Sequence, residues 1–386
     1  MLSELAADRT RVADLDVEIL ALERSLSASR IQRAQVQERL DAYKYPVLTL
    51  PNEIIAEIFI HYLPNYPHCP PLAGLESPTL LTQICRKWRG IALSTPALWR
   101  AISLPDPDIP PAEQGALLEA WLGRCRVHPI SLRFHVYSEP GELGTEILTA
   151  IGPHRTRLQY LVLNQISLPQ LLTFEGPISV LRHLELLLED QEHPLVIKLS
   201  FCDSPLLRTA LLNANGVEST MMPWAQLTSL ALHEFFPADC APILQHTLNL
   251  VHCELALVED PNHEHVPDVT LPSLRSLTLT HILKADSITG YLQTLTLPGL
   301  RSLRVPETFL GPNPIDTLKS FVSKSGCKLE RLCVTGTRSG FDSFYPMAFP
   351  STKISFAQWA MSSVDWIITE FGDARELEEL SATASE

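Results

Sequence analysis

The sequence predicts an α+β protein in which a long N-terminal helix and a compact unit of three helices precede an irregular solenoid of short strands with a helical cap. Three observations support this prediction. Residues 1–42 carry an apolar heptad repeat, residues 45–104 place apolar residues at helical spacing between prolines, and a leucine pattern recurs from about 128 to 340. The chain has 386 residues, 45% hydrophobic and 19% charged, so it can bury the cores of two or three domains.

The composition excludes several classes of protein. Asp and Glu total 44 against 30 Lys and Arg, a net charge of −14, which disfavours nucleic-acid binding because phosphate backbones need clustered cations. No run of about 18 apolar residues could cross a membrane, and the first 30 residues are too charged for a secretory signal. The 8 Cys include no Cys-x-x-Cys pair, so we expect reduced thiols in a cytoplasmic or nuclear protein.

A heptad seam along residues 1–42 predicts one long helix. Charged residues fill most positions outside the seam, and Asp8, Ser29 and Arg33 interrupt it. Two interpretations remain open: a coiled coil with a second copy of the chain, which would make a homodimer, or a helix that folds back onto its own domain. The apolar rows of the seam are Leu5, Val12, Ile19, Leu26 and Leu40, and Leu15, Leu22 and Val36.

Residues 45–104 predict a compact helical unit. The segment before the first helix is extended because residues preceding proline avoid the helical region. A first helix over 51–62 begins with a proline, and a second helix over about 78–94 ends before one. A short turn at 98–99 completes the unit. Residues 105–127 then form a connector in which several prolines precede an amphipathic helix.

Three motifs in this unit carry a resemblance to a known family. Residues 50–59 read Leu-Pro-x-Glu-Ile-Ile-x-x-Ile-Phe, residues 85–91 read Cys-Arg-x-Trp-x-x-Ile, and residues 94–99 read Ser-Thr-Pro-x-Leu-Trp. In this order they resemble an F-box, and they are most similar to fungal F-box-like proteins, in which a coiled N-terminal helix often precedes the motif. The chain departs from the family pattern at 63–77, where a proline-rich insertion lengthens the loop.

The resemblance implies docking on the Skp adaptor of a cullin–RING ubiquitin ligase. A helical unit of this size has a small core, so a partner that covers surplus apolar surface is physically reasonable. The alternative is a private core, which we favour for Trp88, Ile91 and Trp99, whereas the start of the first helix favours the partner. Carried over residue by residue, the adaptor contacts would involve Leu50, Pro51, Ile54, Ile55, Ile58 and Trp88.

From about 128 to 340 an apolar residue recurs at positions i, i+3 and i+5 of successive segments. Each copy predicts a short strand and a return segment, and copies would stack into a curved solenoid because none can bury its apolar face alone. The pattern resembles leucine-rich repeats, although the ladder Asn of that family is mostly missing and Asn215 is the nearest match. The alternative is an α/β domain with leucine-rich strands. The copies lie 20 to 29 residues apart and begin at Leu158, Leu181, Leu207, Leu227, Leu250, Leu274, Leu300 and Leu329, with an earlier one at Val127.

Side chains at i+2, i+4 and i+6 would line the concave face of such a solenoid, because they alternate with the inward leucines. This mixture of polar, charged and aromatic groups suits a client protein better than a nucleic acid. We expect replacement of both His252 and Glu254 to weaken client binding without unfolding the protein. The predicted client-binding set comprises Tyr160, Asn164, His183, Glu185, Asn213, His233, His252, Glu254, Arg304 and Arg331.

Residues 341–386 predict a cap over the last repeat, because an open end of the solenoid would expose apolar surface. The cap would contain a helix over about 356–380, followed by an acidic tail.

Motifs for catalysis and metal binding are absent from the sequence. It contains no phosphate-binding glycine loop, no Gly-x-Ser-x-Gly nucleophile elbow and no His-Glu-x-x-His zinc motif, so we expect neither an enzyme nor a cofactor. His252, Cys253, His263 and His265 lie close together in the sequence, but their spacing matches no usual zinc finger and we expect no metal there.

The sequence therefore predicts the substrate-recognition subunit of a Skp–cullin–F-box E3 ubiquitin ligase. The F-box would bind the Skp adaptor and through it the cullin, and the repeats would select a client protein for ubiquitin-dependent degradation. A non-catalytic scaffold that dimerises through residues 1–42, without a role in ubiquitination, is the alternative. An enzyme with an unrecognised site is a third hypothesis. From the composition we expect neither nucleic-acid nor membrane partners.

Overall fold

The computed structural model describes residues 2–42, 46–107, 109–135, 142–172, 176–189, 198–259, 265–281, 288–336 and 344–357. Internal contacts divide the chain into two units, residues 1–58 and 59–386. The protein is a mixed α/β protein with a long N-terminal helix in the first unit and a large parallel sheet in the second.

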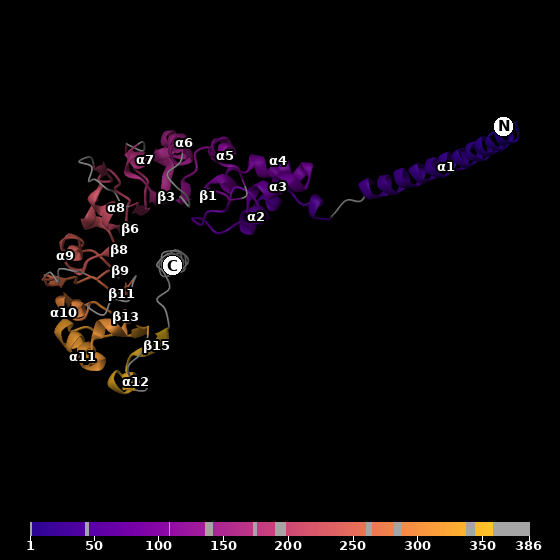
Figure 1. The fold of residues 1–386 in the computed structure, drawn as a ribbon. Coiled ribbons are helices and arrows are strands. Elements are labelled where there is room, and N and C mark those ends of the chain that lie inside the picture. Colours follow the sequence, from indigo (N-terminus) through magenta and orange to yellow (C-terminus); the bar gives the residue numbers. More distant parts are fainter. Residues whose placement is uncertain are drawn as a thin grey trace. The chain divides into compact units, whose positions relative to one another are not determined.

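The first unit is helical (Figure 1). Helix α1 (Leu2–Ala42) runs for 41 residues without a glycine or proline, which confirms the predicted long helix. A short turn, η1 (Pro46–Thr49), follows, and the unit ends inside helix α2 (Asn52–Tyr62). Pro51 stands just before α2 and Glu53 lies in its first turn, where a carboxylate favours the positive end of the helix dipole.

Two helices and a turn open the second unit: α3 (Pro78–Ile84), α4 (Arg86–Ser94) and η2 (Pro96–Trp99). The prediction of one helix over 78–94 is wrong at Cys85, where the backbone is extended with φ −155° and ψ 167°. Its Sγ accepts a hydrogen bond from the backbone N–H of Trp88 at 3.4 Å. Cys85 therefore ends α3 and caps the start of α4.

Aromatic rings fill the centre of this helical part. Trp88 packs edge-on against Phe59, and Trp99 packs edge-on against Trp121 of helix α5 (Pro111–Cys125), each with ring centroids 4.9 Å apart. The indole N–H of Trp99 donates to the Ala92 carbonyl at 2.9 Å, so its buried donor is satisfied.

The proline-rich insertion at 63–77 lies along the first strand of the sheet, β1 (Ala101–Leu104). Pro71 forms a β-bridge with Ser103, whose backbone N–H donates to the Pro70 carbonyl at 2.9 Å. The carboxylate of Asp106 accepts a hydrogen bond from the Ala73 N–H at 2.9 Å. These bonds satisfy backbone groups that the outer strand of a sheet otherwise exposes.

Eleven strands of the described residues form one sheet, and every neighbouring pair is parallel and in chain order. The sheet curves into an arc and does not close on itself (Figure 1). The strands after β1 are β2 (Ile130–His135), β3 (Leu158–Ile166), β4 (His183–Leu188), β6 (Thr209–Asn213), β8 (Ser229–Phe235), β9 (His252–Leu257), β11 (Ser276–His281), β13 (Ser302–Pro306), β14 (Arg331–Thr335) and β15 (Lys353–Ala357).

Two findings at the ends of the sheet differ from the sequence prediction. Strand β1, assigned to the helical unit, pairs with β2. Residues 353–357, the last two of which belong to the predicted cap helix, form β15, because the free edge of β14 pairs with it in parallel register. The rest of that predicted helix and the acidic tail lie outside the described residues.

Return segments connect the strands and lie on the outer side of the arc (Figure 1). They hold two small parallel pairs, β5 (Leu199–Ser200) with β7 (Thr220–Met221) and β10 (Val269–Thr270) with β12 (Leu295–Thr296). Their helices and turns are α5, α6 (Glu142–Ile151), η3 (Gly152–Arg157), α7 (Leu168–Leu172), α8 (Ala214–Glu218), η4 (Trp224–Gln226), α9 (Pro237–Gln245), α10 (Tyr291–Thr294), η5 (Glu307–Leu310), α11 (Pro314–Ser325) and α12 (Phe344–Ala348).

The core lies between the sheet and the return segments. One copy of the leucine pattern begins at Leu227 and buries Leu227, Leu230 and Leu232. The seven other copies from Leu158 onward bury their positions i, i+3 and i+5 in the same way. The earlier copy differs, because Val127 is exposed. Burial of a leucine side chain contributes about 1.5–3 kcal/mol, so the leucines at these positions stabilise the core substantially.

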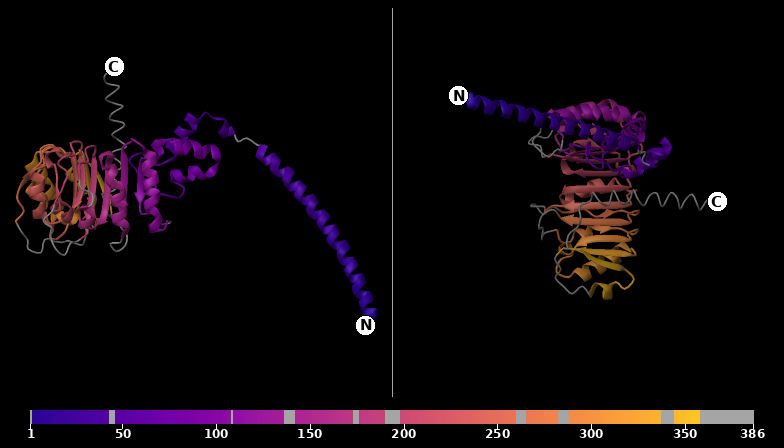
Figure 2. Two further views of the ribbon diagram at one scale, coloured as in Figure 1. Left: turned by 90° about the horizontal axis from the view of Figure 1, so that it is seen from above. Right: turned by 90° about the vertical axis from the view of Figure 1, so that its right-hand side faces the viewer.

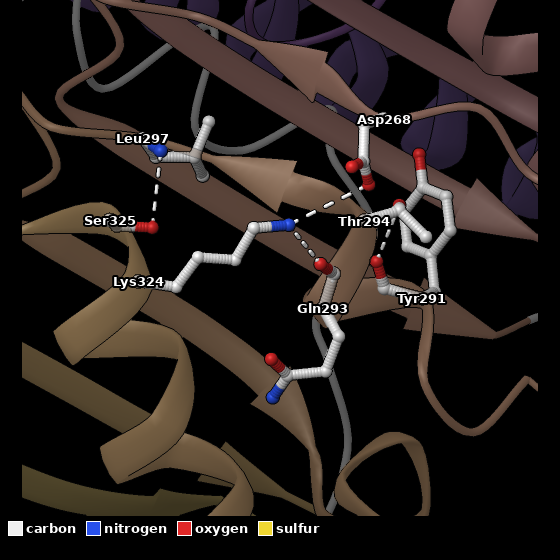
Figure 3. Close-up of polar contacts among 7 residues, drawn as sticks. All are labelled: Asp268, Tyr291, Gln293, Thr294, Leu297, Lys324 and Ser325. Atoms are coloured by element: carbon white, nitrogen blue, oxygen red, sulfur yellow. Dashed lines mark hydrogen bonds and ion pairs between the residues drawn. The ribbon is translucent and has the colours of Figure 1, made fainter.

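Polar contacts link neighbouring return segments, as Figure 3 shows for α10 and α11. The Ser325 hydroxyl accepts a hydrogen bond from the Leu297 N–H at 3.2 Å. The ammonium of Lys324 donates to the Gln293 carbonyl and lies 3.6 Å from the carboxylate of Asp268. Ser325 is buried, so its bond contributes more than the exposed ion pair of Asp268.

Asn213, at the end of β6, holds two neighbouring repeats together. Its amide donates to the Leu188 carbonyl at 2.7 Å and accepts from the N–H groups of Leu188 and Gly216 at 3.1 and 3.0 Å. Asn215, the residue that the sequence favoured as a ladder Asn, donates to the Glu189 carbonyl at 3.2 Å. Asn213 therefore satisfies both backbone groups of Leu188, on the neighbouring strand, through one side chain.

Replacing Asn213 should destabilise the protein strongly. Asn213→Ala leaves three buried backbone groups without their partner, which should lower the free energy of unfolding by about 2–4 kcal/mol. The matched control is Asn249→Ala, because the exposed Asn249 amide makes a single bond, to the Ala225 carbonyl at 2.8 Å. Urea unfolding followed by tryptophan fluorescence measures both. Equal shifts of the two midpoints would contradict the role given to Asn213.

Candidate binding surfaces

The inner face of the arc is the side of the sheet that the return segments do not cover. The right-hand view of Figure 2 looks toward it, with the strands stacked in chain order. Because side chains alternate along a strand, residues between the inward leucines point to this face. We use "inner face" for these positions of β2 to β15.

The strand register aligns the inner face into rows. The first row runs from Tyr160 through His183 and His252 to Arg331. The second row contains Glu185, Leu211, Ala231, Glu254 and Arg304, and the third contains Asn164, Asn213 and His233. All ten residues predicted for the concave face therefore lie on the inner face.

Exposure divides these ten residues. Glu185 and Glu254 are each only 3% exposed, and His183 and Asn213 are also buried, because the sheet curves toward this face and brings neighbouring side chains together. Tyr160, Asn164, His233, His252 and Arg304 are half-buried, and Arg331 is exposed. The expectation that all ten are available to a partner is therefore wrong for the four buried residues.

A polar cluster occupies the inner face at β3 and β4. The Asn164 amide donates to the Glu185 carboxylate at 2.8 Å, and the rings of Tyr160 and His183 lie 6.3 Å apart. Tyr66, from the proline-rich insertion, packs edge-on against Tyr160 at 5.4 Å and donates through its hydroxyl to Gln159 at 2.8 Å. The insertion loop therefore contributes to this part of the face.

Burial lowers the pKa of three histidines of the inner face. Burial, and to a lesser extent the cation of Arg133, lowers the pKa of His183 to about 4. Burial also lowers the pKa of His252, with Arg275 acting in the same direction. For His135 burial lowers the pKa and outweighs the attraction of the Glu185 carboxylate. These rings act as neutral hydrogen-bonding groups at pH 7.

The middle of the inner face is apolar and closely packed. Leu211 and Ala231 are buried side by side, and the half-buried Leu187 packs against them. Glu254 lies beside Ala231 in the register, and its carboxylate is 3.7 Å from the Nε2 of His233. The sequence prediction missed the apolar members, although the same i+4 and i+6 positions identify them, because it selected polar residues.

The far end of the inner face carries cationic side chains. Arg331 and Lys353 are neighbours on β14 and β15 and both are exposed, and Arg304 lies one strand before them. Among the described inner-face positions of β13 to β15, the charged side chains are all cationic. Electrostatic attraction therefore favours an acidic partner at this end.

Helix α2 presents two faces with opposite properties. Ile54 and Ile58, one turn apart, are 49% and 46% exposed, and Pro51 is exposed as well. Ile55, only 1% exposed, is buried, and Leu50 is half-buried. The expectation that Ile55 contacts a partner is therefore wrong, because its side chain is already covered.

Trp88, also predicted to contact an adaptor, is half-buried in the second unit and packs on Phe59. Its indole nitrogen is buried without a hydrogen-bond partner among the described residues. This packing agrees with the core role favoured for Trp88 in the sequence.

The buried thiols are not set up as nucleophiles. Burial raises the pKa of Cys240 to about 12 and raises that of Cys253 as well, so both stay protonated at neutral pH. Within the ranges that the structure describes, no three His, Cys, Asp or Glu side chains gather where they could hold a metal ion. His263, one member of the cluster considered in the sequence, lies outside those ranges.

Neither of two comparisons with known proteins gives a match. A scan against models of protein families finds no match, and a search of curated proteins finds no similar chain. No described helix combines the length and the hydropathy that a membrane span requires.

The buried His183 should make stability depend on pH. Its folded pKa of about 4 lies below the unfolded value, so between pH 6.5 and 4 only the unfolded chain takes up this proton. The free energy of unfolding should therefore decrease as the pH is lowered from 6.5 to 4, and this group accounts for up to roughly 3 kcal/mol of the loss. Urea titrations at pH 7 and 4.5 measure the loss.

His183→Gln should lose less free energy of unfolding between pH 7 and 4.5 than the wild-type protein does. This expectation holds whatever the substitution does to stability at pH 7. The matched control is His246→Gln, since His246 is an exposed histidine at the end of α9. A wild-type pH dependence in His183→Gln would contradict this assignment.

Proposed function

We propose that this chain is the substrate-recognition subunit of a Skp–cullin–F-box E3 ubiquitin ligase. The observation that carries the proposal is the exposed apolar face of α2, at the residues where the sequence resembles an F-box. The finer fold belongs to the same proposal: an F-box followed by an irregular horseshoe of leucine-rich repeats. Parallel strands in chain order with buried leucines at i, i+3 and i+5 support it.

Docking on the Skp adaptor uses Pro51, Ile54 and Ile58. Covering two half-exposed isoleucines removes apolar surface from water, and each fully buried isoleucine contributes about 1.5–3 kcal/mol. A helix that places apolar residues at i and i+4 on an exposed face suits a groove on a partner. Ile55, the neighbour of Ile54 in the same helix, is buried and is not part of this exposed surface.

Client recognition uses the inner face of the sheet. The accessible groups are the half-buried Tyr160 and Asn164 near one end and the cations Arg304, Arg331 and Lys353 near the other. An acidic client segment along the cationic end fits this distribution. The chain supplies no acid, base or nucleophile; it raises the effective concentration of a client lysine near a ubiquitin-loaded enzyme. Such a complex works in the cytoplasm or nucleus.

The adaptor proposal is tested by co-expression with a Skp-type adaptor. We expect the wild-type chain to co-purify with it and Ile54→Ala/Ile58→Ala to bind at least about thirtyfold more weakly, because a loss of about 2 kcal/mol has that effect. Isothermal titration calorimetry on the purified chains gives the ratio.

The matched control for this experiment is Leu117→Ala/Val127→Ala, which truncates two exposed apolar side chains elsewhere and should bind normally. Absence of binding by a folded wild-type chain would refute the adaptor role. Equal binding by both double variants would place the contact on another surface.

The client proposal is tested by charge reversal at the cationic end. Arg304→Glu/Arg331→Glu should abolish capture of client proteins while the adaptor still co-purifies. Lys319→Glu/Lys328→Glu changes the charge equally at exposed positions of α11 and the loop after it, outside the inner face, and should leave capture unchanged. Quantitative mass spectrometry of the captured proteins compares the two. An unchanged set of captured proteins in the first variant would contradict the assignment.

Replacing His252 and Glu254 together is a poorer test of client binding than the sequence suggested. Glu254 is buried beside His233, so its replacement removes a charge from a packed site and lowers stability together with any binding.

A scaffold without a ubiquitination role is the second candidate function. The exposed apolar seam of α1 favours it, because this seam offers a partner-binding surface that the adaptor proposal does not use. Co-purification of a cullin separates the two, since a pure scaffold would bring none.

A further inference from the structure

The seam of α1 is a long apolar surface open to solvent. Its eight apolar side chains are between 40% and 64% exposed, although they follow one stripe of the helix. Three polar residues interrupt the stripe: Asp8 and Ser29 in one row and Arg33 in the other. Val17, Leu20 and Ile31 are exposed apolar residues outside it.

The polar residues of the seam argue against a parallel pair of helices. In a parallel coiled coil in register, each seam residue faces its own equivalent. Asp8 would then face Asp8 of the second copy, and Arg33 would face Arg33. Two like-charged pairs would lie at the interface, where exclusion of water makes repulsion costly.

An antiparallel pair resolves both conflicts. Reversing one helix brings the row of Arg33 opposite the row of Asp8. When residue i faces residue 41 − i of the second copy, Arg33 faces Asp8 at both ends of the pair. The remaining layers are Leu5 with Val36, Val12 with Ser29, Ile19 with Leu22, and Leu26 with Leu15.

Neighbouring antiparallel registers lose this match. A shift by one heptad in one direction places Asp8 opposite Leu26. A shift in the other direction places Asp8 opposite Leu40, and it also places Arg33 opposite Leu15. Each of these registers buries a charge against a leucine. The seam therefore selects one antiparallel register.

Charges beside the seam act in both directions and carry less weight. The antiparallel register sets Arg9 near Arg30 and Asp16 near Glu23, whereas a parallel pair sets Arg11 near Asp16 but also Glu18 near Glu23. These flanking side chains stay in contact with water, where screening by solvent and salt weakens their interactions. The seam pairs are partly withdrawn from water, so they decide the orientation.

We propose that α1 binds α1 of a second copy of this chain as an antiparallel two-stranded coiled coil, in which Arg33 of each helix pairs with Asp8 of the other. The C-terminal ends of the two helices then lie at opposite ends of a rod about 60 Å long, since each residue of a helix adds 1.5 Å. The proposal depends on the seam alone and not on the adaptor function, so either one can fail without the other.

Charge reversal in the full-length chain tests the orientation. Asp8→Lys or Arg33→Glu alone converts both attractive seam pairs into repulsive ones and should raise the dissociation constant of the dimer at least about tenfold. The double variant Asp8→Lys/Arg33→Glu restores opposite charges and should return the constant to within about threefold of wild type. Sedimentation equilibrium at micromolar concentrations measures all four proteins, with circular dichroism to verify the helix.

The matched control is Asp14→Lys/Arg24→Glu, which reverses the same charges at exposed positions outside the seam and should leave dimerisation unchanged. A monomeric wild-type chain overturns the proposal. So does a dimer that tolerates both single reversals, because like-charged pairs of a parallel dimer stay like-charged in every variant. Equal weakening by the control overturns the role of the seam.

A second measurement reads the orientation directly. Chains carrying a donor or an acceptor dye at the N-terminal amine are mixed, and energy transfer is recorded. The antiparallel pair separates the two N-termini by about 60 Å and should give weak transfer, whereas near-complete transfer, as expected for helices about 10 Å apart, overturns the proposal.

Discussion

The packing of each repeat depends on its neighbours, and this constraint determines the rest of the second unit. A strand such as β8 buries Leu230 and Leu232 on one side, and neighbouring strands extend the apolar layer to which they belong. Its backbone N–H and C=O groups also need partners on both sides. Adding the next parallel copy meets both requirements at once, which explains why the strands follow chain order across the whole sheet.

The inner face is a consequence of this packing and is graded along its length. Because the sheet curves toward it, the central side chains crowd together, and Glu185 and Glu254 are buried beside Asn164 and His233. Arg331 and Lys353 at the far end are exposed, whereas His233 and His252 in the middle are half-buried. Charged recognition by this face therefore depends on its far end, and the central carboxylates contribute to the fold.

The local sequence pattern predicted the strands, because apolar residues at i+3 and i+5 are the alternating side chains of one strand face. The same pattern also predicted that these side chains are buried. Features that depend on distant partners were missed. Cys85 breaks a helix that the apolar spacing alone favours, and residues 353–357 form β15 because an edge strand lies beside them. The ten inner-face residues were placed correctly, but the burial of Glu254 depends on the curvature of the sheet, which no repeat specifies alone.

Helices α1 and α2 both expose apolar residues, but they differ in how much of each helix is buried. In α2 the exposed Ile54 and Ile58 stand beside Ile55, whose side chain is buried. In α1 no described residue of the seam is buried. Most helical stability in proteins comes from packing of an apolar face and only a minor part from intrinsic propensity. A partner for α1 would therefore stabilise the helix itself, and binding of that partner would be coupled to helix stability.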